Sequence, residues 1–311
     1  MSMGLVEHFI SRHKGTPDEL ILDFDPTDYR LYGNQEDKHY HGYYEDYCYL
    51  PLYVFCGEHL LISYLRPSDI DGSLHAGAIL KLLVKRLRQA WPNVRIKFRC
   101  DSAFARRHIL HWCEHNNVDY VIGIAQNKRS LKLVEPTLAL AKTNFEAAQE
   151  KQKEFTSFNY AAASWNAQRK IIAKVEYNCK GSNIRMIVTN LKEEIPQVVY
   201  DDQYCPRGDM ENQIKQQKLD LFASRVSCQK FIANQFRVLL SAYAHVLLSM
   251  LRETALAGTK LVNSYYGTLR NKLLKIGAVV IKNTRRIQFL FSAHYSEQDL
   301  FKHVVEKLVP G

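Results

Sequence analysis

The chain has 311 residues, of which 46% are hydrophobic, so it can bury one large core or two smaller ones. Its 18 Tyr and 14 Phe against 9 Pro exclude a disordered chain. The net charge of +10 is unevenly spread, because residues 18–71 hold twelve acidic and three basic residues, whereas residues 254–296 hold seven basic residues and no acid. This basic part fits a polyanion, for which nucleic acid is the natural candidate and an anionic membrane a weaker one.

The seven cysteines form no C-x-x-C pair, and their odd number favours a reduced compartment. His39, His41 and Cys48 could be drawn as a zinc site, but without paired spacing we interpret them as structural. The first ten residues lack the apolar core of a signal peptide, and we identify no apolar run of bilayer-spanning length. We therefore expect a cytoplasmic protein with no membrane partner.

The N-terminal part predicts a short helix followed by antiparallel strands. After a turn that ends at Pro17, residues 20–25 alternate, with Leu20, Leu22 and Phe24 on one face and two acids, Asp23 and Asp25, on the other. Two aromatic and apolar runs follow, residues 43–56 and 59–65. The two-residue break between them predicts a hairpin.

The next segments alternate between helix and strand. Residues 73–91 form an amphipathic pattern that stops at Pro92, and residues 94–101 alternate and end at Asp101. A helical stretch over 103–115 and a short apolar strand over 119–125 come next. The order of three strands, helix, strand, helix, strand predicts an α/β RNase H-like mixed sheet flanked by helices, with sites at the carboxyl ends of its parallel strands.

The remaining chain predicts an insertion and a return to the core. Residues 127–200 begin with a polar helical stretch and continue with two β-like runs, 170–178 and 184–191, so we expect a mostly β insertion. We therefore divide the chain into residues 1–126, 127–200 and 201–311. Residues 231–251 predict a core helix with a mostly apolar face, on which residues recur in a heptad-like way at Phe231, Gln235, Leu239, Tyr243, Leu247 and Leu251.

A helix beginning near Arg207 organises the predictions about function. Its polar residues recur every three or four positions and so share one side: Tyr204, Arg207, Glu211, Lys215 and Lys218. Met210, Ile214, Gln217 and Leu221 form a mostly apolar stripe beside them. The helix can therefore bury one edge while it presents a carboxylate flanked by cations.

This helix carries the spacing Y-x2-R-x3-E-x6-K at Tyr204, Arg207, Glu211 and Lys218. The pattern resembles the Tyr-Arg-Glu-Lys signature of DDE-type bacterial insertion-sequence transposases, and residues 208–225 resemble the branch with a "GDMEN" run. Further runs that resemble this branch are residues 41–61, 99–107, 183–191 and 273–278. The resemblance covers nearly the whole chain.

Three acids on separate predicted elements fit phosphodiester cleavage, since two Mg²⁺ ions bound by carboxylates can stabilise both the attacking and the leaving oxygen. The candidate catalytic and metal-binding residues are Asp25, Asp101 and Glu211, and Asp23 is the rival of Asp25. Each acid alone has an ordinary explanation, as a turn residue, a helix cap or a surface partner of Lys215. Their joint placement, together with the resemblance, favours a site for two Mg²⁺ or Mn²⁺ ions.

The resemblance implies a transposase that cleaves transposon ends and transfers the strand into target DNA, with double-stranded DNA as substrate and a homodimer when complete. Tyr204, Arg207, Lys215 and Lys218 are the implied DNA contacts. Arg99, Arg106 and Arg107 could guide a strand but are more simply solvated charges, and Trp165 could stack on a base but is more simply core. An inert DNA-binding remnant and a structure-selective nuclease stay open as alternatives.

Two departures from the family pattern are visible. Gln213 and Gln216 replace an expected Arg and Glu, which we interpret as a loss of charge near the active face of the helix. Relatives carry a DNA-binding and dimer-forming region before the first catalytic strand, and that strand begins here at Leu20. We therefore expect an N-terminally truncated catalytic domain.

Overall fold

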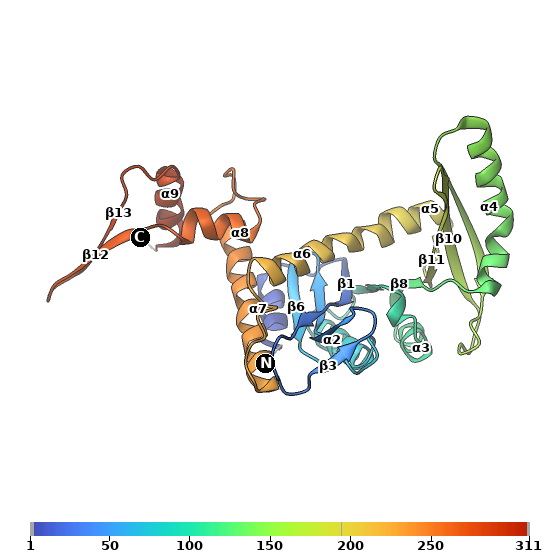
Figure 1. Ribbon diagram of the computed structural model, residues 1–311, viewed down its shortest axis with the longest axis horizontal. Coiled ribbons are helices and arrows are strands. Elements are labelled where there is room, and N and C mark those ends of the chain that lie inside the picture. Colours follow the sequence, from blue (N-terminus) through green and yellow to red (C-terminus); the bar gives the residue numbers. More distant parts are fainter. Residues whose placement is uncertain (1–2, 194, 310–311) are drawn as a thin grey trace.

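The computed structural model describes residues 3–193 and 195–309 (Figure 1). Its centre is an eight-stranded mixed sheet with the strand order β6-β5-β1-β7-β8-β11-β10-β9. The strands are β1 (Glu19–Pro26), β5 (Leu52–Cys56), β6 (His59–Tyr64), β7 (Arg95–Cys100), β8 (Val118–Ile124), β9 (Gln152–Tyr160), β10 (Arg169–Asn178) and β11 (Gly181–Thr189). The predicted mixed sheet flanked by helices is confirmed.

The strands β6, β5, β1, β7 and β8 form the first part of this sheet along the chain. β1 pairs antiparallel with β5 and parallel with β7, and β7 pairs parallel with β8. The alternation in β1 was predicted correctly, because Leu20, Leu22 and Phe24 all lie in the main core. Since β1 and β7 are parallel, the acids at their carboxyl ends lie at the same edge of the sheet.

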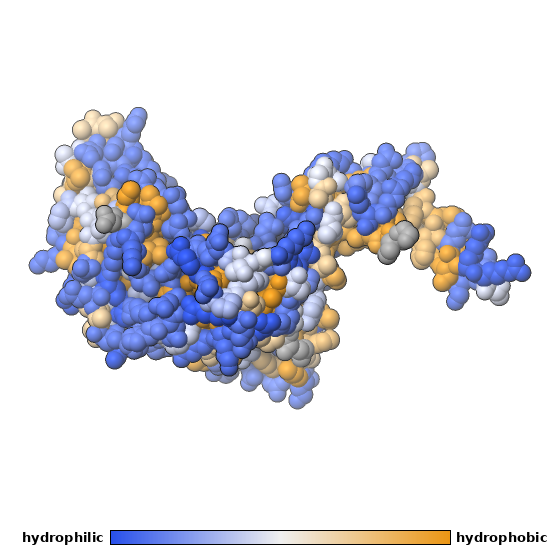
Figure 2. All heavy atoms as spheres, turned by 180° about the vertical axis from the view of Figure 1, so that it is seen from behind, coloured by the Kyte–Doolittle hydropathy of each residue, from blue (hydrophilic) through white to orange (hydrophobic). Residues whose placement is uncertain are grey.

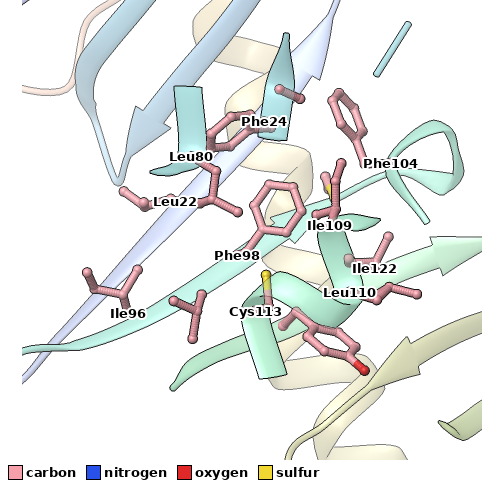
Figure 3. Close-up of a cluster of buried hydrophobic side chains, with 14 of the residues drawn as sticks. Leu22, Phe24, Leu80, Ile96, Phe98, Phe104, Ile109, Leu110, Cys113 and Ile122 are labelled. Atoms are coloured by element: carbon pink, nitrogen blue, oxygen red, sulfur yellow. The ribbon is translucent and has the colours of Figure 1, made fainter. Parts of the chain in front are cut away.

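Helices pack on this sheet through apolar stripes. They include α1 (Met3–Arg12), α2 (Ala76–Ala90) and α3 (Arg107–His115). In α2, Leu80, Leu83 and Leu87 are buried, and the helix ends two residues before Pro92, which cannot donate a helical hydrogen bond. Figure 3 shows Leu80 next to Phe24, with the side chains of α3 on the other side of Phe98. The sheet and its helices therefore form one core that fixes the ends of β1 and β7.

Residues 127–200 extend the sheet. Helix α4 (Lys128–Ala148) begins at Asn127, whose side chain accepts a hydrogen bond from the Ser130 backbone. β11 pairs antiparallel with β8, and β10 and β9 follow, so this part continues the central sheet while α4 packs on β9 and β10 (Figure 1). β9 was not predicted from the sequence. The proposed three-part division of the chain stays a prediction.

The aromatic run over residues 43–56 forms two strands rather than one. A small sheet contains β2 (Tyr29–Arg30), β3 (His39–His41) and β4 (Asp46–Tyr49), and β5 begins only after Pro51. Pro51 lacks the backbone N–H that a continuous strand needs. The predicted hairpin at residues 57–58 is present between β5 and β6, with Gly57 at a φ of 59°.

The helix that contains Glu211 and Lys218 is the last part of a longer helical segment, which we call the rod. The rod consists of α5 (Pro196–Val198), a π-helical turn over Val199–Tyr204, a 3-10 turn over Cys205–Arg207 and α6 (Gly208–Leu219). Figure 1 shows this rod running from the β9–β11 end of the molecule to α7 (Phe231–Glu253). Met210, Ile214 and Gln217 are buried, as the predicted stripe requires. The opposite side of α6 is left free for the charged residues.

Helix α7 packs against β6 and α6, but its predicted core positions are partly wrong. Leu239 is buried, whereas Tyr243 and Leu247 are exposed. Steps of four residues advance by 40° per step around a helix with 3.6 residues per turn, so such a series leaves the buried face after a few turns. Within the described residues, α7 is also one helix that is long and apolar enough to cross a membrane by length and composition, which corrects our view that the sequence holds no such run.

The C-terminal part projects from the body of the molecule (Figure 1). It contains α8 (Tyr266–Leu269), a π-helical turn over Arg270–Leu274, β12 (Ala278–Lys282), β13 (Ile287–Phe291) and α9 (Gln298–Leu308). All ten residues of the β12–β13 hairpin are exposed, and most are apolar. Figure 2 shows hydrophobic side chains along this arm.

Candidate active site

The three predicted acids come from three elements that meet at one edge of the sheet. Asp25 lies at the end of β1, Asp101 directly follows β7, and Glu211 is in the first turn of α6. α6 contacts β1, and the electrostatic influence of Asp101 and Glu211 reaches Asp25. The fold therefore brings together three carboxylates that are distant in the sequence.

One guanidinium joins two of these acids. Nη1 of Arg207 lies 3.4 Å from Oδ1 of Asp25, and its Nη2 donates to Oε1 of Glu211 at 2.8 Å. Asp25 is mostly buried, while more than half of the Glu211 side chain is exposed. Burial alone would lower the pKa of Arg207, but Asp25, Glu211 and Asp101 outweigh it and raise that pKa. Arg207 thus lies where the negative charges of the site converge.

Asp25 is the most perturbed acid of the site. Burial raises its pKa to about 7, and the charges of Asp101, Glu211 and Asp23 add to this effect, while Arg207 opposes it. A buried carboxylate surrounded by other carboxylates is costly to ionise without cations nearby. The site therefore has a deficit of positive charge, even with Arg207 in place.

Asp101 has a second role as the cap of a short 3-10 helix over Ser102–Phe104. Its Oδ1 accepts a hydrogen bond from the Ala103 backbone at 2.9 Å. Burial raises the pKa of Asp101, and Glu211 adds to this, although the Ala103 bond and Arg207 oppose it. The cap fixes one carboxylate oxygen, and among the described residues no hydrogen bond is made to the other, which can therefore act as a ligand.

The chemistry of these residues fits divalent cations. Within residues 3–193 and 195–309, no group of three or more His, Cys, Asp or Glu side chains is arranged so that it could hold a metal ion. Asp25 and Glu211 instead converge on a cationic group of Arg207, and carboxylate oxygens are the ligands that Mg²⁺ and Mn²⁺ prefer. The three carboxylates could hold metal ions if Arg207 gives up its contact with them.

Asp23, the rival of Asp25, lies two residues earlier on the same face of β1 but has a different partner. Both its oxygens accept hydrogen bonds from Arg99, at 2.5 and 2.7 Å, and Arg99 also donates to the Gln203 carbonyl at 3.0 Å. Only 3% of Asp23 and 6% of Arg99 is exposed, so the expectation that Arg99 is a solvated charge was wrong. This buried pair connects β1 to β7 and to the helical rod.

The predicted DNA contacts have different surroundings. Lys215 is exposed, whereas Lys218 donates to Asp28 at 2.9 Å and to Thr27 at 3.2 Å. Tyr204 is half-buried beside Tyr200, with 5.6 Å between the ring centroids. Two of the charged residues therefore already have partners within the chain, Arg207 on the acids and Lys218 on Asp28. The sequence analysis missed Asp28, although it follows Asp25 by only three residues.

Three other residues considered in the sequence lie at the start of α3 or between β9 and β10. Arg106 pairs with Asp71 at 2.5 Å, and Arg107 begins α3. Trp165 is partly buried against the core, with the Arg169 guanidinium 5.3 Å from its ring. This placement agrees with a packing role for Trp165.

The two glutamines that depart from the family pattern do not lie on the charged side of α6, so the interpretation of lost charge near the active face was wrong. Gln213 and Gln216 are buried, 9% and 6% exposed, and Oε1 of Gln216 accepts a hydrogen bond from the Tyr266 backbone. Gln217 beside them binds Ser241 of α7. Neutral amides at these positions avoid buried charge where α6 packs on α7 and α8.

Gly123 in β8 makes the close approach of the rod possible. A Cβ atom at this position would lie 2.8 Å from the Tyr204 hydroxyl and 3.1 Å from the Ser102 backbone nitrogen. We expect Gly123→Ala to displace Tyr204 and the loop that carries Asp101, and to lower stability by about 1–3 kcal/mol. Thermal unfolding followed by circular dichroism measures this loss.

Gly208→Ala is the matched control for that substitution. Gly208 begins α6, and a Cβ atom there would meet nothing within 4 Å. Since Ala is the better helix former, this variant should be as stable as the wild type or more stable. Equal melting temperatures for the two variants would contradict the steric role of Gly123.

Comparisons with known proteins identify the family of this chain. The family model described as transposase DDE domain group 1 matches residues 1–310. Among solved structures, the chain is similar to the piggyBac transposase in its synaptic complex with hairpin DNA, with 13% sequence identity and a TM-score of 0.44. The similarity covers 96% of this chain and 59% of that transposase, so the chain spans about three fifths of its length. No curated protein matches the sequence.

Proposed function

We propose that this chain, which belongs to group 1 of the DDE-domain transposases, cleaves DNA at the ends of a mobile element and transfers the strand into target DNA. The observation that carries the proposal is the convergence of Asp25 and Glu211 on Arg207, with Asp101 close enough to influence both Asp25 and Arg207. We further assign the chain to the "GDMEN" branch, on the spacing of Tyr204, Arg207, Glu211 and Lys218.

The proposed cofactors are two divalent ions, Mg²⁺ or Mn²⁺, held by Asp25, Asp101 and Glu211. When bound, such ions activate a hydroxyl nucleophile and neutralise charge on the leaving oxygen. The raised pKa values of Asp25 and Asp101 support this assignment, because nearby cations would remove the cost of ionising both. Asp23 is not in the proposed set, since Arg99 already occupies both of its oxygens.

The reaction needs two phosphoryl transfers. In the first, water attacks the phosphorus of a phosphodiester at the element end, and the P–O3′ bond breaks to leave a 3′-hydroxyl and a 5′-phosphate. In the second, that 3′-hydroxyl attacks a phosphodiester of the target, which forms a new 3′–5′ linkage and releases a 3′-hydroxyl on the target strand. In both steps the phosphate oxygens carry negative charge that nearby cations stabilise.

The cationic residues of the rod have roles in binding the substrate. Arg207 can form two parallel hydrogen bonds to a phosphate once the acids hold cations, while Lys215 and Lys218 contribute point charges. Lys218 is positioned by Asp28 and Thr27, close in sequence to Asp25. We therefore propose that the scissile strand passes between the end of β1 and the charged side of α6.

We also propose that the active form is a homodimer. The exposed apolar hairpin β12–β13 supports this, because an isolated two-stranded ribbon is marginally stable in water until another surface covers it. Sedimentation analysis at several protein concentrations tests the proposal. A monomer at all concentrations, with and without DNA, contradicts it.

The experiment that tests the proposed function is a cleavage assay. The DNA segments that flank the coding sequence are placed in a labelled duplex and incubated with the protein, with Mg²⁺ or with a chelator. We expect metal-dependent products with a free 3′-hydroxyl at the element ends. Products that form equally without metal, or none with either Mg²⁺ or Mn²⁺, would refute the proposal.

A further inference from the structure

Phe222, just beyond the end of α6, is held in an unfavourable backbone conformation. Its φ of 57° lies in the left-handed region, which a bulky side chain rarely adopts. The neighbouring residues Ala223 and Val226 are buried, and the Ala223 backbone donates to the Gln217 carbonyl, so the turn is fixed on both sides. Phe222 as a whole is 40% exposed. The fold therefore presents an aromatic side chain to solvent at a cost in stability.

Two guanidinium groups lie on this ring. The Cζ atom of Arg225 is 4.1 Å from the ring centroid, and that of Arg270 is 4.5 Å away. In the part of the chain that the structure describes, neither arginine belongs to an ion pair. Arg225 is exposed, and a third arginine, Arg237, donates to its carbonyl at 2.8 Å. Two like charges gathered on one ring create a potential that attracts an anion.

This cluster borders a groove that is lined by Arg225 and by Lys218 of α6. The groove has a volume of about 740 Å³, and its lining includes Asp28, Arg30, Lys218, Ser224 and Arg225. Lys218 reaches Thr27 and Asp28, two and three residues after Asp25. One part of the groove lining, Asp28, therefore lies three residues after Asp25, and another part, Ser224 and Arg225, lies two and three residues after Phe222.

On these grounds we propose that Phe222, Arg225 and Arg270 form a docking site for a DNA strand. Backbone phosphate groups bind the two guanidiniums, and an unpaired base packs on the exposed part of the ring. The inference rests on the proposed function and deepens it, because it assigns the path of the substrate beyond the acids. Stacking on an aromatic ring combined with cationic contacts to the backbone is a general means of holding single-stranded nucleic acid.

The distribution of charge favours DNA over an acidic protein segment. Residues 254–296, which contain Arg270, hold seven basic residues and no acid. Of the groove cations, Lys218 is paired with Asp28 and Arg30 with Asp46, so Arg225 is the one without a carboxylate partner among the described lining residues. A regularly spaced polyanion can contact Arg225, Arg270 and the basic segment in succession.

The test measures binding of a fluorescein-labelled duplex with a single-stranded 3′ tail, by anisotropy at several salt concentrations. Arg225→Gln and Arg270→Gln should each reduce the slope of log K against log salt by about 1, because each removes one phosphate contact. Phe222→Asn should weaken binding of the tailed duplex by roughly 10-fold. The same variant should melt at a higher temperature than the wild type, since Asn tolerates the left-handed conformation.

Arg129→Gln is the matched control. The Arg129 guanidinium also lies over a ring, 5.8 Å from the centroid of Tyr160, but it belongs to α4 at the far end of the molecule (Figure 1). The affinity of the Arg129→Gln variant for the tailed duplex, and the dependence of that affinity on salt, should equal those of the wild type. If Arg225→Gln and Phe222→Asn bind as the control does while the wild type still binds and cleaves, the docking site is wrong and the proposed function stands. If the wild type binds no DNA, both are wrong.

Discussion

Asp25→Asn, Asp101→Asn and Glu211→Gln are each expected to reduce metal-dependent cleavage by at least roughly 1,000-fold, because groups that act as one unit fail together when one is removed. Each substitution keeps the size of the side chain and removes its negative charge, so the metal ions lose a ligand. DNA binding should be retained, since the phosphate contacts come from the arginines and lysines. Cleavage of the labelled duplex and its anisotropy measure the two effects separately.

Asp209→Asn is the control for these variants. Asp209 lies in the same first turn of α6 as Glu211 and is exposed, but no hydrogen bond links its side chain to Arg207 among the described residues. Its cleavage rate should stay close to that of the wild type. Wild-type cleavage by Asp101→Asn or Glu211→Gln would remove these acids from the mechanism.

Asp25→Asn has a second expected effect, on stability. Because burial raises the pKa of Asp25 to about 7, the folded state binds a proton more tightly than the unfolded state does. The stabilising contribution of the protonated form is complete below about pH 4 and is lost as pH rises through 7. In the presence of a chelator, Asp25→Asn should therefore match the wild type at pH 5 and melt at a higher temperature at pH 8. If Asp25→Asn melted at a lower temperature than the wild type at pH 8, the claim that the site lacks positive charge would be wrong.

The sequence predicts the scaffold of this site well, for physical reasons that can be traced to particular residues. The alternation of Leu20, Leu22 and Phe24 is the period of a strand with one buried face, and the same residues lie in the core. The spacing of Arg207, Glu211 and Lys218 places them on one side of a helix, and Arg207 does contact Glu211 four residues later. Local periodicity is sufficient for such predictions.

What the sequence does not predict depends on tertiary contacts. β9 has a polar sequence with little alternation, and it is a strand because β10 pairs with it along its whole length. Leu247 is exposed because one face of α7 packs on β6 and α6, and a series of four-residue steps rotates away from that face. In the same way, the sequence favours Asp25 over Asp23 only by its place nearer the strand end, whereas the structure shows Arg99 of the neighbouring strand bound to Asp23. In these cases the outcome depends on which elements pack against each other, and the sequence alone does not show this.

The buried pair of Asp23 and Arg99 leads to the second large effect. Arg99→Met removes the guanidinium and leaves the Asp23 carboxylate buried without its partner. Breaking a buried ion pair costs about 3–5 kcal/mol, and for a chain of this size the melting temperature should fall by on the order of 10 °C. Differential scanning calorimetry at pH 8 measures this loss.

The loss should depend on pH in a defined direction. Burial already raises the pKa of Asp23, and without Arg99 this pKa rises further. A carboxyl group whose folded-state pKa is raised stabilises the protein at low pH and loses that contribution as pH increases. The difference between Arg99→Met and the wild type should therefore shrink at pH 5. A loss that is the same at both pH values would indicate that Arg99 acts through packing rather than through Asp23.

The double variant Asp23→Asn/Arg99→Met completes the argument. It removes both charges, so most of the stability lost by Arg99→Met at pH 8 should return. It should also cleave DNA below its melting temperature, because the proposed ligand at the end of β1 is Asp25 and remains intact. A double variant that is stable and folded but does not cleave would transfer the metal-binding role from Asp25 to Asp23.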